Sequence, residues 1–167
     1  MTAHYRRSVG FSWIGLVFSL ADGDPSLLLV LFPPRDPPSS ALAPVPRSLT
    51  VLERIGQASC LVIPPLSTSL QRRIDLWLVL AAACYCIYLG LWGRYVLRGR
   101  RRVMLLRSWA RIPIPLAVFP VLTFAFAAVW ARSPWLAGAT VILAAGHLPA
   151  TWITAKQQLA ESARAEE

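Results

Sequence analysis

Long apolar runs separated by short polar segments dominate the second half of the chain. Leu76–Gly93 and Ile112–Ala131 contain no charged residue, and Ser133–Ala155 contains His147 as its one ionisable side chain. These runs have 18, 20 and 23 residues, and a helix needs about 20 apolar residues, rising 1.5 Å each, to cross the hydrocarbon core of a bilayer. The pattern therefore predicts three membrane-spanning helices, over residues 74–97, 112–131 and 134–155.

Tryptophans mark the ends of the same runs. Six of the seven lie near a boundary, in pairs that bracket each run: Trp77 and Trp92, Trp109 and Trp130, Trp135 and Trp152. An indole ring prefers the headgroup region, where its N–H stays hydrated. The positions indicate an aromatic belt at both faces of a membrane.

The N-terminal third has two interpretations. Val9–Phe32 is apolar except for Asp22 and Asp24, which predicts a helix over 9–32 interrupted at 22–25. Alternatively, residues 1–21 are a cleaved signal peptide with a basic start at Arg6 and Arg7 and a small-residue cleavage site at Ala21. A retained span is favoured because the apolar pattern resumes after the interruption.

A proline-rich segment and an amphipathic segment follow. Residues 33–48 contain six prolines, which predicts a stiff, extended linker. Residues 49–66 place Glu53, Gln57, Cys60 and Pro64 on one helical face, so this helix either spans the membrane with that face toward the bundle or lies in the interface. Residues 156–167 form a polar tail.

Composition agrees with a membrane protein. Hydrophobic residues make up 56% of the 167 residues and charged residues 15%, which is more apolar surface than a soluble domain of this size can bury. The net charge is +9, but the basic residues cluster between apolar runs, so membrane topology explains them without a nucleic-acid partner. Three cysteines form no disulfide framework, and the sequence predicts no metal and no cofactor.

The arginines predict an orientation. Seven of them, and no acidic residue, lie within 94–111, and such a loop is retained in the cytoplasm. The turn at 132–134 is then external and the C-terminus cytoplasmic. Five spans put 12 basic residues inside and 5 outside, whereas four spans give 11 and 6, so the charge rule leaves the location of the N-terminus open.

Polar residues at membrane depth are the candidate functional residues, because burying them in lipid costs several kcal/mol. They are Glu53, Arg54, Gln57 and His147. A histidine can carry protons or bind a metal, but it can equally bond a neighbouring carbonyl. Glu53 and Arg54 can also mark a helix start at the interface.

The arginine loop is also a candidate surface for anionic lipid headgroups. The expected contacts are Arg98, Arg100, Arg101, Arg102 and Arg107, since each cation near the membrane surface contributes about 1 kcal/mol of attraction. Apolar residues 103–106 interrupt the arginines, so this stretch is expected to lie on the leaflet. The alternative is a topology anchor without a ligand.

Enzyme signatures such as GxSxG, HExxH and the P-loop are absent. The Gly146–Pro149 stretch is slightly similar to the histidine helix of intramembrane CAAX-type proteases, but the paired glutamates of those enzymes are missing. More broadly, the chain resembles uncharacterised small multi-pass membrane proteins of GC-rich bacteria. That resemblance rests on Phe32-Pro-Pro-Arg35, Leu52-Glu-Arg54, Ile112-Pro-Ile-Pro115 and Gly146-His147, and it implies no activity.

These observations predict an all-α, polytopic transmembrane bundle in the cell membrane, with five spans or, alternatively, four. The expected function is that of a non-enzymatic scaffold or accessory subunit that contacts lipid and binds another membrane protein or itself. The alternative is a small transporter or permease component, and an intramembrane enzyme is least favoured. A stripe of small residues, Ala82, Cys86 and Gly90, is expected to form a helix–helix contact, within the chain or between subunits.

Overall fold

The computed structural model describes residues 29–36, 43–66, 74–106, 108–109 and 112–164. Their regular structure is helical, as predicted: α3 (Arg47–Val62), α4 (Leu76–Leu97), α5 (Arg102–Leu106), α6 (Pro115–Trp130) and α7 (Pro134–Arg164). One isolated bridge joins Trp109 and Ile112. The expected helix over 9–32 and the signal-peptide alternative lie outside the described residues, apart from a short helical piece at 29–31.

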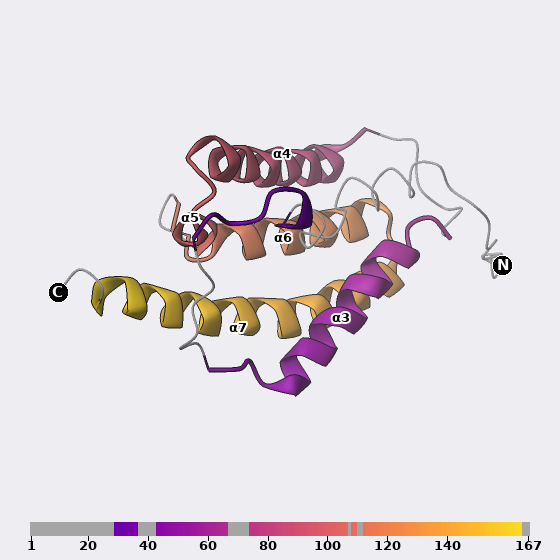
Figure 1. Cartoon of the computed structure of the whole chain (residues 1–167). Coiled ribbons are helices and arrows are strands. Elements are labelled where there is room, and N and C mark those ends of the chain that lie inside the picture. The colour runs from indigo at the N-terminus through magenta and orange to yellow at the C-terminus, as the bar shows by residue number, and fades with distance from the viewer. Residues whose placement is uncertain (1–28, 37–42, 67–73, 107, 110–111, 165–167) are drawn as a thin grey trace, which may run out of the picture.

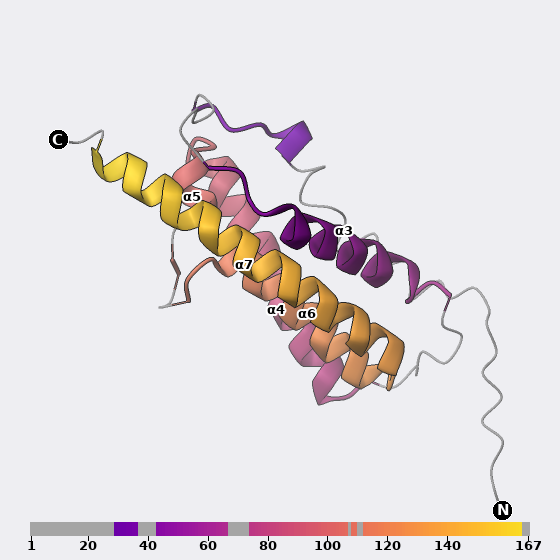
Figure 2. The same ribbon diagram turned by 90° about the horizontal axis from the view of Figure 1, so that it is seen from below.

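The helices form a stack in the order α4, α6, α7, α3. Helices α4, α6 and α7 lie side by side, and α3 crosses α7 on the side away from α4 (Figure 1). The view turned by 90° shows the same order, with α3 beside α7 and α4 behind α6 (Figure 2). Because the turn between α6 and α7 is short, these two helices are antiparallel.

Local sequence signals set the helix starts. The Asp75 carboxylate accepts hydrogen bonds from the backbone N–H groups of Trp77 and Leu78, at 3.0 and 3.2 Å. The Ser133 hydroxyl accepts one from Leu136 N–H at 3.2 Å. Both side chains satisfy backbone donors that have no partner inside the helix, so α4 and α7 begin immediately after a capping residue.

Helix α6 is shorter than the sequence pattern predicted. The expected span began at residue 112, but the helix begins at Pro115, after Ile114 adopts a left-handed conformation with φ of 45°. Proline at the first helical position has a favourable φ and lacks only an N–H that the helix does not use. The two prolines that flank Ile114 therefore delay the helix by one turn.

Bulky side chains form the contact between α4 and α6. Cys84, Tyr88, Leu91, Trp92 and Tyr95 of α4 form a buried cluster with Phe119 of α6. The rings of Tyr88 and Trp92, and those of Trp92 and Tyr95, meet edge to face with centroids 6.4 and 5.4 Å apart, an arrangement that aromatic quadrupoles favour.

The small-residue stripe does not form this contact. Ala82, Cys86 and Gly90 are exposed on the opposite side of α4, and a Cβ added at Gly90 would meet no atom within 4 Å. The prediction of a stripe contact within the chain is therefore wrong for the described residues. The reason is that α6 supplies large side chains, which fill the space between the two helices without a close backbone approach.

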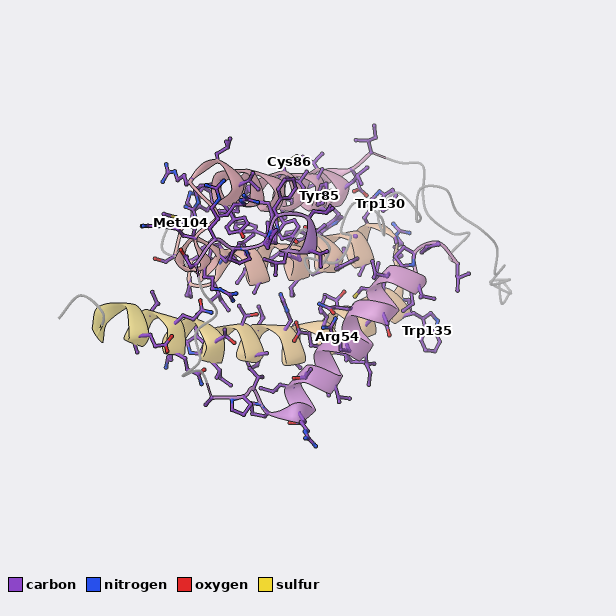
Figure 3. All side chains as sticks on the ribbon, viewed as in Figure 1. Arg54, Tyr85, Cys86, Met104, Trp130 and Trp135 are labelled. Atoms are coloured by element: carbon purple, nitrogen blue, oxygen red, sulfur yellow. The ribbon has the colours of Figure 1, made fainter. Side chains whose placement is uncertain are left out.

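The tryptophans divide into two groups. Trp77, Trp109, Trp135 and Trp152 are exposed, as residues of an interfacial belt would be, whereas Trp92 and Trp130 are buried in the protein, with exposures of 6% and 4%. Figure 3 shows Trp135 extending away from the first turn of α7. For Trp92 and Trp130, packing against neighbouring helices replaces the expected contact with lipid headgroups.

Candidate functional site

The crossing of α3 and α7 brings two of the predicted polar residues together. Nδ1 of His147 lies 2.7 Å from Oε1 of Glu53, although the residues are 94 positions apart in the chain. Their side chains are 14% and 23% exposed, respectively. An ionised carboxylate can only accept a hydrogen bond, so Nδ1 carries the proton when Glu53 is charged.

Two glycines allow this close crossing. A Cβ added at Gly56 would meet the backbone of Leu143, with its nitrogen at 2.5 Å, and one added at Gly146 would meet the Glu53 Cα at 2.8 Å and the Leu49 carbonyl at 2.9 Å. No Cβ fits at such distances. The two backbones are therefore in direct contact at the Glu53–His147 pair and again about one turn away, where Gly56 meets Leu143.

The other candidate residues of α3 lie at the edge of this crossing. Gln57, one turn after Glu53, is half-buried on the same face, whereas Arg54 is exposed. Figure 3 labels Arg54 on the ribbon of α3 near the crossing. The structure thus unites Glu53 with His147, places Gln57 beside them on α3, and directs Arg54 toward the surface.

The crossing supplies too few ligands for a metal. In the part of the chain that the structure describes, no three His, Cys, Asp or Glu side chains come together to hold an ion. Structural metal sites use four protein ligands and catalytic zinc sites use three. Here the one carboxylate and the one imidazole bond each other.

The arginine loop forms a second polar region at the end of α4. The loop is tied to the start of the proline-rich linker: Tyr95 donates its hydroxyl proton to the Phe32 carbonyl at 2.9 Å, and Arg35 N–H bonds the Arg100 carbonyl at 3.0 Å. The Arg102 N–H bonds the Asp36 carboxylate at 2.9 Å. We call residues 32–36, held by these three bonds, the clamp.

The arginines of this loop differ in exposure. Arg98 and Arg101 are exposed, and Arg94, Arg100 and Arg102 are half-buried. The Nε atoms of Arg94 and Arg102 are shielded from solvent without a hydrogen-bond partner. The predicted contact residue Arg107 lies outside the described residues.

Helix α5 carries apolar residues that were expected to lie on the membrane leaflet. Met104 and Leu105 pack instead against the cluster between α4 and α6. Figure 3 labels Met104, a residue of α5, at this end of the bundle. These two side chains are only partly buried there, so a leaflet contact of this stretch stays a prediction.

The sequence did not identify several residues that shape these regions. Nothing in the sequence predicted that Gly56 and Gly146 allow two helices to cross closely, although each lies within three residues of a candidate polar residue. The clamp was not recognised either, because its bonds join residues that are far apart in the chain. Tyr95 and Phe32 are 63 positions apart, and Arg102 and Asp36 are 66 positions apart. The weak signal for the clamp was Asp36 itself, which is an isolated acid next to Arg35 in the proline-rich segment.

Comparison of the chain with protein-family models, with curated proteins and with solved structures finds no match in any of the three. The structure itself therefore defines the class: an all-helical chain in which α4 and α7 are long and apolar enough to cross a membrane and α6 is a shorter apolar helix. Within it, a polar pair lies at a tight helix crossing and a group of arginines lies at one end.

Proposed function

We propose that the protein is an integral, multi-pass protein of the cell membrane. Large apolar side chains stay exposed along α4 and α7, among them Val79, Leu89 and Val141 at 53%, 44% and 68%. Within the most apolar stretch of 18 residues in α4 and in α7, only 28% and 33% of the residues, respectively, are buried. A core helix of a soluble protein would be mostly buried, so lipid is the natural environment for these surfaces.

Threonines on the apolar helices support the same proposal. Thr123, Thr140 and Thr154 each donate a hydroxyl proton to the carbonyl four residues earlier, at 2.8 to 3.0 Å. Such bonds satisfy a hydroxyl without water. They suit a helix surrounded by lipid, where an unpaired polar group costs several kcal/mol.

The clamp supports a cytoplasmic location for the start of the linker. It holds Arg35 against Arg100, so both belong to one face of the membrane if the arginine loop is cytoplasmic. Helix α3 then runs toward the end of the bundle at which α4 begins and α6 meets α7 (Figure 1). This arrangement favours α3 as a short span of about 24 Å over a helix that lies in the interface. Five spans then require the expected helix over 9–32, which lies outside the described residues.

Single-cysteine labelling tests this topology. In a background without the native cysteines, a reagent that cannot cross the membrane is expected to label Ser133→Cys and not Ser108→Cys in intact cells. Resistance of the protein to alkaline carbonate extraction tests the membrane location itself. Labelling of position 108 alone would reverse the orientation, and extraction by carbonate would refute an integral protein.

Within the membrane, we propose the role of a non-enzymatic scaffold or accessory subunit. The observation that carries this role is the crossing of α3 and α7, where backbone atoms lie in contact beside the Glu53–His147 pair. In lipid, small residues and polar bonds hold helices together because there is no hydrophobic drive between them. The pair therefore holds α3 and α7 together.

A small transporter is the second candidate, because Glu53 and His147 are both ionisable and already share a hydrogen bond. Such pairs carry protons in membrane pumps and transporters. Purified protein in liposomes that contain a pH-sensitive dye separates the two roles. The scaffold role predicts no proton flux above that of empty liposomes in the parent, and lower thermal stability in Glu53→Gln. Flux that disappears in both Glu53→Gln and His147→Gln would overturn the scaffold role and establish the transporter.

A further inference from the structure

The arginine end of the bundle has a charge pattern that the proposed scaffold role does not require. Residues 94–111 contain seven arginines and no acid. The Asp36 carboxylate, which contacts this region, accepts a bond from the backbone of Arg102. The exposed guanidinium groups of Arg98 and Arg101 thus lie in a strongly positive environment.

The backbone around these arginines is held in place. Helix α4 ends with Gly99 and Arg100 in left-handed conformations, at φ of 88° and 56°, and Arg100 N–H bonds the Tyr95 carbonyl at 3.0 Å. Tyr95 is fully buried. The clamp bonds both ends of this turn, so the arginines extend from an ordered platform, and ordered cations bind an anion at a lower entropic cost than flexible ones do.

The position of this platform matches the depth of lipid phosphates. The arginines follow directly after the apolar run of α4, and α6 begins at Pro115, at the far end of the loop, with no side-chain cap. The N-terminus of α6 adds partial positive charge to the same end. Guanidinium groups bind phosphate oxygens through two parallel hydrogen bonds.

We propose that Arg98 and Arg101, on the turn held by the clamp, form a binding site for the phosphate headgroup of anionic phospholipids. The site rests on the proposed membrane location but not on the scaffold role. Asp36 opposes the ligand electrostatically while it holds the turn through a hydrogen bond. An asparagine at this position keeps an acceptor oxygen and removes the negative charge.

Lipid binding by the full chain in nonionic detergent tests the site. Phosphatidylglycerol and phosphatidylcholine are titrated, and bound lipid is counted by native mass spectrometry. The parent is expected to prefer phosphatidylglycerol. The double variant Arg98→Gln/Arg101→Gln should weaken phosphatidylglycerol binding about 30-fold, since each cation contributes about fivefold, and Asp36→Asn should strengthen it about fivefold.

The controls separate a defined site from general attraction. Arg132→Gln removes an exposed arginine at the opposite end of the bundle and should leave binding unchanged. Arg98→Lys/Arg101→Lys keeps the charge, reports on folding, and should lose less than the glutamine pair. An equal loss in Arg132→Gln, or no preference for phosphatidylglycerol, would overturn the site. Inorganic phosphate that competes at the same concentration as the lipid would show that the ligand is free phosphate. Carbonate extraction is independent of all these results, so a failed lipid site leaves the membrane proposal intact.

Discussion

Two helix contacts in this molecule are formed in opposite ways. At the α3–α7 crossing, Gly56 and Gly146 allow the backbones to touch, and a polar pair joins the helices. At the α4–α6 contact, Tyr88, Trp92 and Phe119 fill a wider space with aromatic rings. The first contact depends on the absence of side chains and the second on their size.

The difference shows that a small residue identifies a contact only when its surroundings are known. Gly56 and Gly90 both lie inside helices, and each directly follows an apolar residue. Gly56 meets the backbone of Leu143, whereas Gly90 faces open space. The distinguishing feature lies in what each glycine faces. Helix α7 presents a glycine of its own one turn from Leu143, whereas in the described part of the chain no helix packs against the side of α4 that carries Gly90.

The largest effect is expected where the two backbones touch. Gly56→Ala and Gly146→Ala each place a Cβ against a backbone that cannot move without separating α3 from α7. Overpacking of this kind costs about 1–3 kcal/mol and occasionally more. Thermal unfolding in mild detergent should show a marked loss of stability for both variants.

Gly90→Ala is the matched control for these variants. It adds the same methyl group to a helical glycine with no neighbour within 4 Å, so stability should stay the same or rise slightly, because alanine favours a helix by about 1 kcal/mol over glycine. Equal losses at positions 56 and 90 would contradict the asymmetry between the two contacts.

A somewhat smaller effect is expected from a cavity in the aromatic contact. Leu91 is 5% exposed, in the cluster between α4 and α6, and Leu91→Ala leaves a void there. In aqueous proteins such truncations cost about 2–5 kcal/mol. In lipid the transfer part of this cost falls away, so we expect a loss below this range and below that of the two glycine variants, measured by the same unfolding assay. Cys86→Ala, on the exposed side of α4, should have no effect.

Periodicity and composition predicted the all-helical fold and the apolar runs that form most of α4, α6 and α7. Helix α7 continues to Arg164, beyond the predicted end at residue 155, into the polar tail. They could not predict which face of α4 packs, because the whole helix is apolar and no polar side reveals its orientation. Glu53 and His147 were recognised from their cost in lipid. Their pairing was not, since 94 residues separate them and the glycines that bring them together lie on two different helices.

The polar pair at the crossing is expected to have a moderate effect. Glu53→Gln and His147→Gln each weaken the 2.7 Å contact, and hydrogen bonds between membrane helices contribute about 0.6 kcal/mol on average and up to about 1.7. A double-mutant cycle on unfolding in detergent measures the coupling between the two residues. Additive losses would mean that Glu53 and His147 do not interact. The proposal that this pair holds α3 and α7 together would then be wrong.

The smallest effect is expected from Gly90→Leu, although the added side chain is large. If the open side of α4 faces lipid, a leucine there extends into hydrocarbon and the unfolding temperature of the monomer stays close to that of the parent, while Leu91→Ala lowers it. This order reverses the one that the small-residue stripe predicts. The same variant examines a contact between subunits, since Ala82, Cys86 and Gly90 remain free to meet a second copy. Light scattering in mild detergent separates the outcomes: an unchanged mass for parent and Gly90→Leu assigns the stripe to lipid, whereas a dimer that dissociates in Gly90→Leu and persists in Leu91→Ala assigns it to an interface between copies, as glycine-mediated packing requires.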